Sequence, residues 1–258
     1  NYTLAANVEN LTLTGAGNYS ALGSADNNLI IGNAQFNSID GGAGADTMRG
    51  MGGDDFYWVD NAGDVVEEAL GDGNDWVFSQ VSFTLGANVE NLQLIAGTAA
   101  IGNELDNSIS ANEAANILDG GAGTDVLSGG DGDDTYRFGR GYGNDTIFEQ
   151  DSIGGSMDTV EMAADIAPGD VIVSRGGSDL ILSISGTSDS LRLGSFLAGP
   201  ENEVERVLFS DGTIWTAAML RDMGVINGTA GADTLNGTPV DDTIFGLAGN
   251  DTLNGFAG

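Results

Sequence analysis

A period of nine residues runs through much of the chain and limits what it can fold into. In five consecutive units, residues 23–67, the sixth place holds Asp or Asn and the eighth place is apolar. The same register returns at residues 102–137 and 228–254. After Asp64 and after Asp134 the step to the next aspartate is eleven, which we interpret as two residues inserted at the same place in both copies. A unit this short cannot bury its apolar face alone, so the period predicts a solenoid of stacked coils.

Each unit divides into six turn residues and three strand residues. Side chains alternate between the faces of a strand, so the apolar eighth residue is expected to point inward. Two units then form one coil of eighteen residues, and equivalent residues of successive coils stack. The fold predicted is all-β, a parallel β-roll (β-solenoid) built of nonapeptide repeats. Its expected inner stack contains Ile30, Ile39, Met48, Tyr57 and Val66.

A longer repeat divides the chain further. The segment YTLAANVENLTL (2–13) matches FTLGANVENLQL (83–94), so we expect one repeat unit at 1–81 and a second at 82–150. Residues 151–225 leave the period and alternate apolar and polar residues around short turns. That pattern predicts an additional antiparallel β segment, with an Asp211-Gly212 turn and one short helix, which we interpret as a cap. Nonapeptides resume at 226–258.

Composition excludes several classes of function. The chain has 39 acidic and 7 basic residues, a formal net charge of −32, and neither Cys nor His. Polyanions such as nucleic acid are therefore poor partners. Without His, Cys or Lys, the remaining metal ligands are oxygen atoms, which hard cations prefer. No stretch is long and apolar enough to span a membrane.

Stacking brings the sixth-place carboxylates close together. Asp46, for example, is expected against Asp64, where the two charges would repel by roughly 1–4 kcal/mol. A divalent cation would turn that repulsion into attraction, and flexible oxygen ligands suit Ca²⁺ better than Mg²⁺. Glycine turns leave backbone carbonyls open to join the ligands. The candidate metal ligands are Asp46, Asp55, Asp64, Asp75, Asp125, Asp134, Asp145, Asp233, Asp242 and Asp251, then Asn28, Asn37, Asn107 and Asn116, with the turn glycines Gly44, Gly53, Gly123, Gly132, Gly231 and Gly249.

Three units carry a resemblance to a known family. GGAGADTMR (41–49), GGAGTDVLS (120–128) and GGDGDDTYR (129–137) resemble the RTX (repeat-in-toxin) nonapeptide G-G-x-G-x-D-x-U-x, in which U is apolar. Residues 151–225 resemble the haemolysin-type calcium-binding related domain. The resemblance implies several bound Ca²⁺ ions, a right-handed parallel β-roll, bacterial type I secretion and a secreted or cell-surface location. Some units depart from the pattern, with Asn at the sixth place or, beside Asp242, Pro and Val in the turn.

We therefore expect a calcium-binding β-roll module of a larger secreted bacterial protein, folding on Ca²⁺ after export and without catalysis of its own. The sequence is interpreted as a fragment. One alternative is an enzyme that uses paired carboxylates, Asp54-Asp55 or Asp133-Asp134, for acid–base chemistry. Another is a calcium-stiffened adhesin or glycan-binding spacer that uses Trp58, Trp76 and Arg137.

Overall fold

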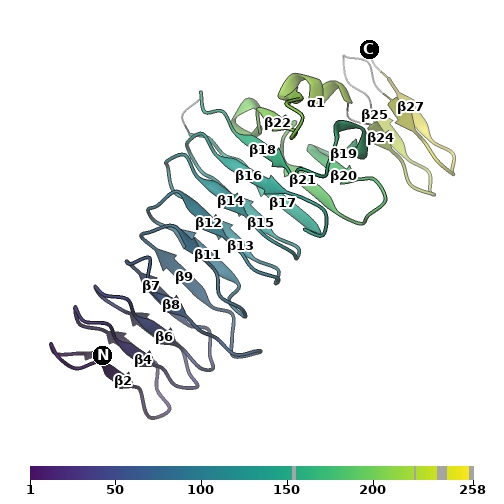
Figure 1. Ribbon diagram of the computed structural model, residues 1–258. Helices are drawn as coiled ribbons and strands as arrows, with labels where there is room; N and C mark the ends of the chain where they lie inside the picture. The colour runs from purple at the N-terminus through teal and green to yellow at the C-terminus, as the bar shows by residue number, and fades with distance from the viewer. Residues whose placement is uncertain (153–154, 224, 237–242, 256–258) are drawn as a thin grey trace. The chain divides into compact units, whose positions relative to one another are not determined.

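The computed structural model describes residues 1–152, 155–223, 225–236 and 243–255 (Figure 1). The described chain is nearly all β, as the period predicted. It divides into two compact units, Asn1–Gly130 and Asp131–Gly258. The repeat boundaries at 81, 150 and 225 follow sequence similarity rather than compactness and stay predictions.

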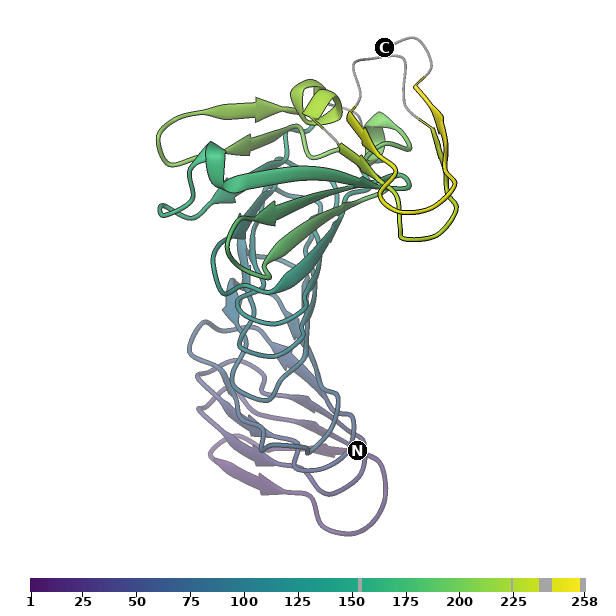
Figure 2. The ribbon, with the colours of Figure 1, turned by 90° about the vertical axis from the view of Figure 1, so that its right-hand side faces the viewer.

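In the first unit, three sheets of parallel strands form the sides of the coils. One sheet holds every second strand, a second covers the early coils, and a third covers the later ones. In sheet order, the first contains β1 (Tyr2–Thr3), β3 (Tyr19–Leu22), β5 (Asn37–Asp40), β7 (Phe56–Val59), β9 (Trp76–Ser79), β11 (Asn91–Leu94), β13 (Ser108–Ser110) and β15 (Val126–Ser128); the second, β2 (Asn10–Thr12), β4 (Leu29–Ile31), β6 (Thr47–Arg49) and β8 (Val65–Val66); the third, β10 (Phe83–Thr84), β12 (Ala99–Ile101) and β14 (Ile117–Asp119). Figure 2 shows successive coils of this unit, purple to blue, lying one behind another.

The register of these strands confirms the eighteen-residue coil. Thr47 pairs with Leu29 and with Val65, each eighteen residues away. The longer step after Asp64 shifts the next pairing to twenty residues, so that Phe56 lies beside Trp76. The extra residues are therefore absorbed in a turn, and the strands keep their stacking.

The predicted inner stack is the core of the first unit. Ile30, Ile39, Met48 and Tyr57 have no exposed surface, and Val66 is 4% exposed. Each such side chain contributes about 1.5–3 kcal/mol when it is buried. The core is a ladder of single residues, one from each side of every coil, rather than a deep globular centre.

The second unit contains the remaining strands and the only helices among the described residues. One sheet has β16 (Thr135–Phe138), β18 (Thr159–Met162), β22 (Arg206–Leu208) and β23 (Ile214–Thr216), and another has β17 (Asn144–Phe148), β21 (Ser190–Gly194), β20 (Asp179–Ile184), β19 (Val171–Gly176), β24 (Val225–Asn227) and β26 (Thr243–Phe245). A pair, β25 (Thr234–Asn236) and β27 (Thr252–Asn254), stands apart, and the helices are α1 (Ala217–Met223) and the 3₁₀ turns Pro168–Asp170 and Pro200–Asn202.

The antiparallel segment expected within 151–225 is present. β19 pairs antiparallel with β20, β20 with β21, and β22 with β23 across the predicted Asp211-Gly212 turn. The predicted short helix is α1. The segment also continues the roll, because β21 lies parallel to β17 and β22 lies parallel to β18.

Close stacking of the turns predicts that Gly23→Ala destabilises the chain. A Cβ on Gly23 would overlap the carbonyl oxygen of Gly41 and lie 2.6 Å from Oδ1 of Asn28. We expect a loss of about 1–3 kcal/mol in the free energy of unfolding, measured by denaturant titration in calcium. The control is Gly169→Ala, where a Cβ meets nothing within 4 Å. Equal stability of the two variants would contradict the close stacking of these turns.

Candidate metal centres

Sixth-place carboxylates form a ladder along one side of the first unit. The backbone N–H of Asn28 donates to Oδ1 of Asp46 at 2.6 Å, and the N–H of Asp46 donates to Oδ1 of Asp64 at 2.9 Å. Equivalent residues therefore lie one above another, as the period predicted. Each Asp is anchored by one oxygen to the backbone of the preceding coil, so the carboxylates do not simply face each other.

A second ladder runs along the opposite turns of the same unit. The N–H of Asn37 donates to Oδ1 of Asp55 at 2.6 Å, and that of Asp55 donates to Oδ1 of Asp75 at 2.7 Å. The ladder ends at a glutamate, because the N–H of Asp75 donates to Oε2 of Glu90 at 2.9 Å. Asp55 and Asp75 are 0% and 1% exposed.

The second unit repeats this arrangement. The N–H of Asp134 donates to Oδ1 of Asp158 at 2.8 Å, and the N–H of Asp158 donates to Oε2 of Glu205 at 2.7 Å. The ladder that begins at Asp134 therefore also ends at a glutamate, Glu205. Near the end of the chain, a separate hydrogen bond joins the N–H of Asp233 to Oδ1 of Asp251 at 3.0 Å.

The other carboxylate oxygen separates two kinds of candidate. In Asp64 and Asp233 it accepts backbone N–H groups from the residue's own turn. In Asp46, Asp55 and Asp75 the Oδ2 atom is buried and has no hydrogen-bond partner. A buried, unpartnered carboxylate oxygen is costly unless it is protonated or bound to a cation. These three aspartates therefore fit a hard cation best.

The sixth-place asparagines behave like the first kind. Oδ1 of Asn28 accepts the N–H of Ser24 at 2.6 Å, and Oδ1 of Asn37 accepts the N–H of Asn33 at 2.7 Å. Asn107 does the same with its own turn. Their amide oxygens already have donors, so hydrogen bonding between turns accounts for these residues without an ion. Their ligand role stays a prediction.

The remaining candidates lie in similar positions. Asp125, Asp134, Asp145 and Asn116 are buried at the ends of coils, and Asp251 is partly exposed. The turn glycines Gly44, Gly53, Gly123, Gly132 and Gly249 have positive φ, from 111° to 144°, and Gly231 does not. Asp242 lies outside the described residues.

Several acidic residues that cluster with the ladders were not among the predicted ligands, namely Glu68, Glu149, Asp151, Asp158 and Glu205. Asp55, Glu68 and Asp75 offer carboxylate oxygens within 4.8 Å of one another, and so do Asp134, Glu149 and Asp158. A third group of this size is Asp151, Asp158 and Glu205.

The sequence does contain a signal for two of these glutamates, Glu68 and Glu149. Each stands four residues after an Asp of the repeat, in DVVEE (64–68) and DTIFE (145–149), and each lies beside a tyrosine of a G-D-D-x-Y segment. This equivalence corrects the prediction that the extra residues have the same place in both copies. In the first copy the longer step follows Glu68, and in the second it precedes Asp145.

Burial and neighbouring carboxylates raise the pKa of these groups. Burial, and next the charge of Asp64, raise the pKa of Asp46 to about 6. Burial and the charge of Asp75 raise the pKa of Asp55 to about 7. Burial, and next the charge of Glu90, raise the pKa of Asp75 to about 6. The energetic cause is the same in each case, a negative charge held away from water beside other negative charges.

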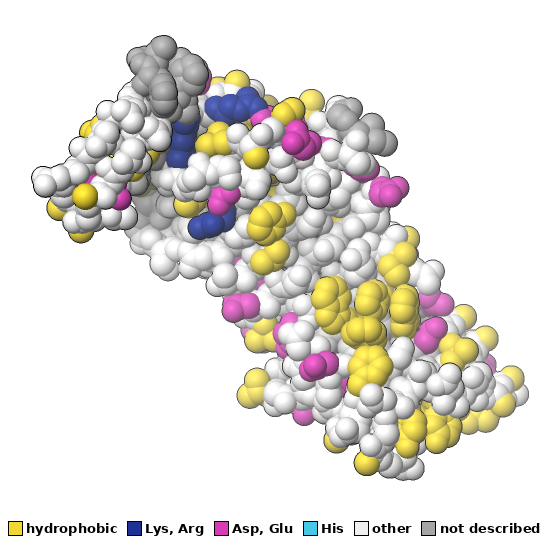
Figure 3. Space-filling model, turned by 180° about the vertical axis from the view of Figure 1, so that it is seen from behind, with side chains coloured by type: hydrophobic (Ala, Val, Ile, Leu, Met, Phe, Trp, Pro, Cys, Tyr) yellow, Lys and Arg dark blue, Asp and Glu magenta, His cyan; other side chains and the backbone are white. Residues whose placement is uncertain are grey.

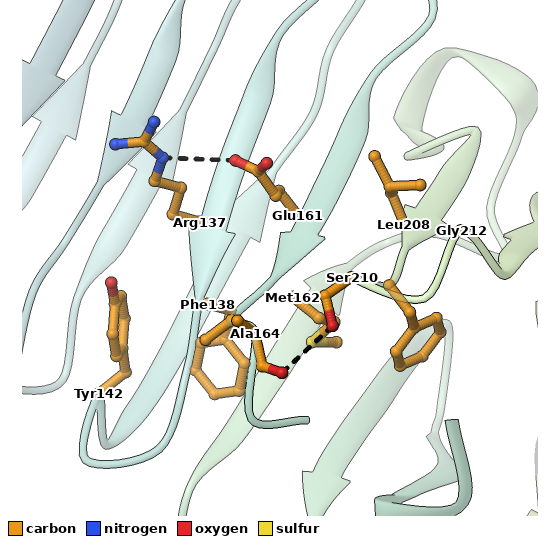
Figure 4. A pocket seen from close by; sticks show the side chains of 11 residues that line it. Arg137, Phe138, Tyr142, Glu161, Met162, Ala164, Leu208, Ser210 and Gly212 are labelled. Carbon is orange, nitrogen blue, oxygen red and sulfur yellow. Dashed lines mark hydrogen bonds and ion pairs between the residues drawn. The ribbon is translucent and has the colours of Figure 1, made fainter. Parts of the chain in front are cut away.

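The paired aspartates proposed for catalysis face different ways. Asp55 is buried in its ladder, whereas Asp54 is exposed and accepts the N–H of Asn74. A hollow of about 530 Å³ lies over β16, β18 and β22 (Figure 4). Its carboxylate, Glu161, forms an ion pair with Arg137 at 3.4 Å. Neither the Asp54-Asp55 pair nor this hollow brings two carboxylates to face a common cavity.

Two family models match the chain. The RTX calcium-binding nonapeptide repeat matches residues 22–57, 101–136 and 227–258, and the haemolysin-type calcium binding protein related domain matches residues 179–219. Among the described residues, no helix is long and apolar enough to cross a membrane.

Two individual proteins resemble parts of the chain. The endo-1,3-1,4-beta-glycanase ExsH of Rhizobium meliloti is 43% identical over 63 residues, which is 24% of this chain and 14% of that protein. The structure of the extracellular lipase LipA from Serratia marcescens aligns with 70% of this chain and 38% of its own, with a TM-score of 0.28 and 17% identity. We therefore infer nothing about this chain from the lipase. The nonapeptide register, the β-roll and the family matches together show that the chain belongs to the proteins with RTX calcium-binding nonapeptide repeats, and that it binds multiple Ca²⁺ ions.

Proposed function

We propose that this chain is the part of a secreted bacterial protein that folds on calcium after export. The observation that carries the proposal is the recurrence of buried, unpartnered carboxylate oxygens at Asp46, Asp55 and Asp75. Without a cation these oxygens oppose folding, and the formal net charge of −32 adds repulsion throughout the chain. With calcium bound, the same oxygens hold successive coils together.

The energetics favour cooperative folding. Extracellular calcium modules have dissociation constants of roughly 10⁻⁴–10⁻³ M, so one site contributes only about 0.4–1.4 kcal/mol at millimolar calcium. That gain is too small to order a coil of eighteen residues. Sites in adjacent coils must therefore act together. Low calcium inside the cell would keep the chain unfolded for type I export, and calcium outside would fold it.

We assign no catalytic step to this chain. The Asp54-Asp55 pair does not form an acid–base pair, because Asp55 is buried in its ladder whereas Asp54 is exposed. The activity of the whole secreted protein would then belong to other segments. In the glycanase relative, the match to this chain likewise covers only 14% of the protein, and the rest of its sequence lies outside the match.

Calcium titration tests the folding proposal. We expect far-ultraviolet circular dichroism to change steeply from coil to β near millimolar calcium, with a Hill coefficient above one, because several weak sites must fill together. Magnesium at the same concentration should leave the chain unfolded, since it demands a more rigid octahedral site. A chain that is already folded in chelator and indifferent to calcium would contradict the proposal.

Stability in chelator should fall as the pH rises. The pKa values of Asp46, Asp55 and Asp75 are raised to about 6–7 in the folded chain, against about 4 when unfolded. Between these values the folded chain binds more protons, so its free energy of unfolding decreases as the pH increases.

Thermal unfolding followed by circular dichroism at pH 5 and pH 7.5 checks this expectation. Any structure that persists in chelator should melt at a higher temperature at pH 5. Saturating calcium should reverse the order, because calcium competes with protons for the same oxygens. A higher melting temperature at pH 7.5 in chelator would show that these carboxylates do not carry the linkage.

A specific observation favours glycan binding as a second candidate function. A groove of about 270 Å³ on the outer face of β1, β3 and β5 is lined by Tyr2, Ser20, Ser38, Asp40 and Trp58 among others. One face of the Trp58 indole is stacked on Phe78 of the next strand, with ring centroids 4.7 Å apart. Trp58 also lines the groove and is 36% exposed. Figure 3 shows hydrophobic side chains gathered on this part of the first unit.

This groove suits a neutral polysaccharide. An indole face packs against the C–H face of a sugar ring, protein hydroxyl groups donate hydrogen bonds to sugar hydroxyls and accept them, and a carboxylate accepts them. The acidic surface disfavours anionic glycans. The relative's name, endo-1,3-1,4-beta-glycanase, makes a 1,3-1,4-β-glucan the first probe.

Trp58→Ala should weaken binding of this β-glucan roughly tenfold, because it removes the large aromatic ring that lines the groove. Affinity electrophoresis in calcium measures the effect. Leu70→Ala is the control, since Leu70 is 87% exposed and does not line the groove. Equal retardation of both variants and the parent chain, or no retardation of any of them, would remove this candidate.

A further inference from the structure

We infer that each compact unit carries a calcium site of a second kind, in which a glutamate held by a tyrosine joins two ladder aspartates. The first site contains Asp55, Glu68 and Asp75, and the second contains Asp134, Glu149 and Asp158. The inference rests on the proposed calcium-binding function and adds ligands that the nonapeptide pattern does not contain. It also distinguishes these clusters from turns in which Asp or Asn is satisfied by its own backbone.

In the first unit, the glutamate and the aspartates come from the two ends of stacked turns. Asp55 and Asp75 directly precede β7 and β9, whereas Glu68 follows β8 near the start of the turn that ends at Asp75. The Tyr57 hydroxyl donates to Oε1 of Glu68, and the N–H of Gly50 donates to the same oxygen at 3.1 Å. Both donors turn Glu68 inward, and its Oε2 atom is buried without a hydrogen-bond partner.

Three unpartnered oxygens therefore meet in one place. Oδ2 of Asp55, Oε2 of Glu68 and Oδ2 of Asp75 are all buried, and the three side chains offer oxygens within 4.8 Å of one another. Asp55 and Asp75 are at least 99% buried. Three carboxylates at this separation without a cation would repel strongly, so a divalent ion fits the cluster.

The second unit has the same construction from different residues. The Tyr136 hydroxyl donates to Oε1 of Glu149, and Tyr136 has no exposed surface. Oε2 of Glu149 and Oδ2 of Asp158 are buried without hydrogen-bond partners, in side chains 3% and 0% exposed. Asp134 completes the group. Repetition with different loop lengths argues that the cluster is a built feature rather than an accident of one turn.

Burial supports the assignment electrostatically. It raises the pKa of Glu68 to about 8, and the charge of Asp75 adds to the effect. Burial and then the charge of Asp158 raise the pKa of Glu149 to about 9. Without metal, protons would therefore occupy these clusters near neutral pH. The competing explanation is that protons alone neutralise these buried carboxylates, and this explanation predicts that no calcium binds at the two clusters.

The test counts calcium ions on the full chain by equilibrium dialysis and follows Tb³⁺ luminescence excited through nearby aromatic rings. The variants are Glu68→Gln and Glu149→Gln. Each should bind one calcium ion fewer than the parent chain. Each should also keep or gain stability in chelator, because the neutral amide cannot ionise inside the cluster as the glutamate does when the pH rises. The controls are the exposed neighbours Glu67→Gln and Glu161→Gln, whose side chains are 46% and 47% exposed and ion-paired.

A third variant tests the second site by a measurement other than the number of calcium ions bound. Tyr136→Phe should keep the calcium count and lose the part of the Tb³⁺ luminescence that comes from the second site, because the phenol beside that site is its sensitiser, whereas Tyr57 remains beside the first site. Unchanged counts in both glutamine variants, with calcium still bound by the chain, would overturn this inference and leave the proposed function standing. A parent chain that binds no calcium would overturn both. A glutamine variant that fails to fold in calcium, with unchanged Tb³⁺ luminescence in Tyr136→Phe, would also overturn it.

Discussion

The fold depends on one interaction, the hydrogen bond from the backbone N–H of one coil to a buried carboxylate of the next. In the bond from Asn28 to Asp46 it fixes the vertical spacing of the turns, as the strand ladders do for the straight segments. A neutral amide could accept the same hydrogen bond without burying a charge. The repeated choice of Asp at these buried positions therefore makes sense when a cation binds the second oxygen.

The same constraint explains why the core can be thin. Each coil contributes single residues such as Met48 and Tyr57 to the inner stack, so apolar burial per coil is limited. Conformational entropy of glycine-rich turns opposes folding. Calcium then supplies the missing stabilisation in small increments at many sites, which makes the coils interdependent. Order in one coil prepares the ligands of the next.

Much of this architecture could be predicted because it follows from periodicity. The inner stack, the spacing of eighteen and the ladder from Asp46 to Asp64 require only alternation along strands and equal coil lengths. The glutamates could not be found that way. Glu68 stands at the first place of its turn, where the nonapeptide pattern has glycine, so the pattern does not mark it as a ligand. The ladder ends at Glu90, which lies outside the nonapeptide units, so the period of nine does not predict this end either.

Ladder and outer face are mechanically linked in the first unit. The hydrogen bond from Asp55 to Asp75 joins the coils of β7 and β9, the strands that carry Trp58 and Phe78 on the outside. The stack of these two rings requires a fixed spacing between the coils. Calcium at Asp55, Glu68 and Asp75 would hold that spacing from the inside, and Trp58 would then line a groove of constant width. An ion that stabilises the roll would thereby also preorganise its outer surface for a ligand.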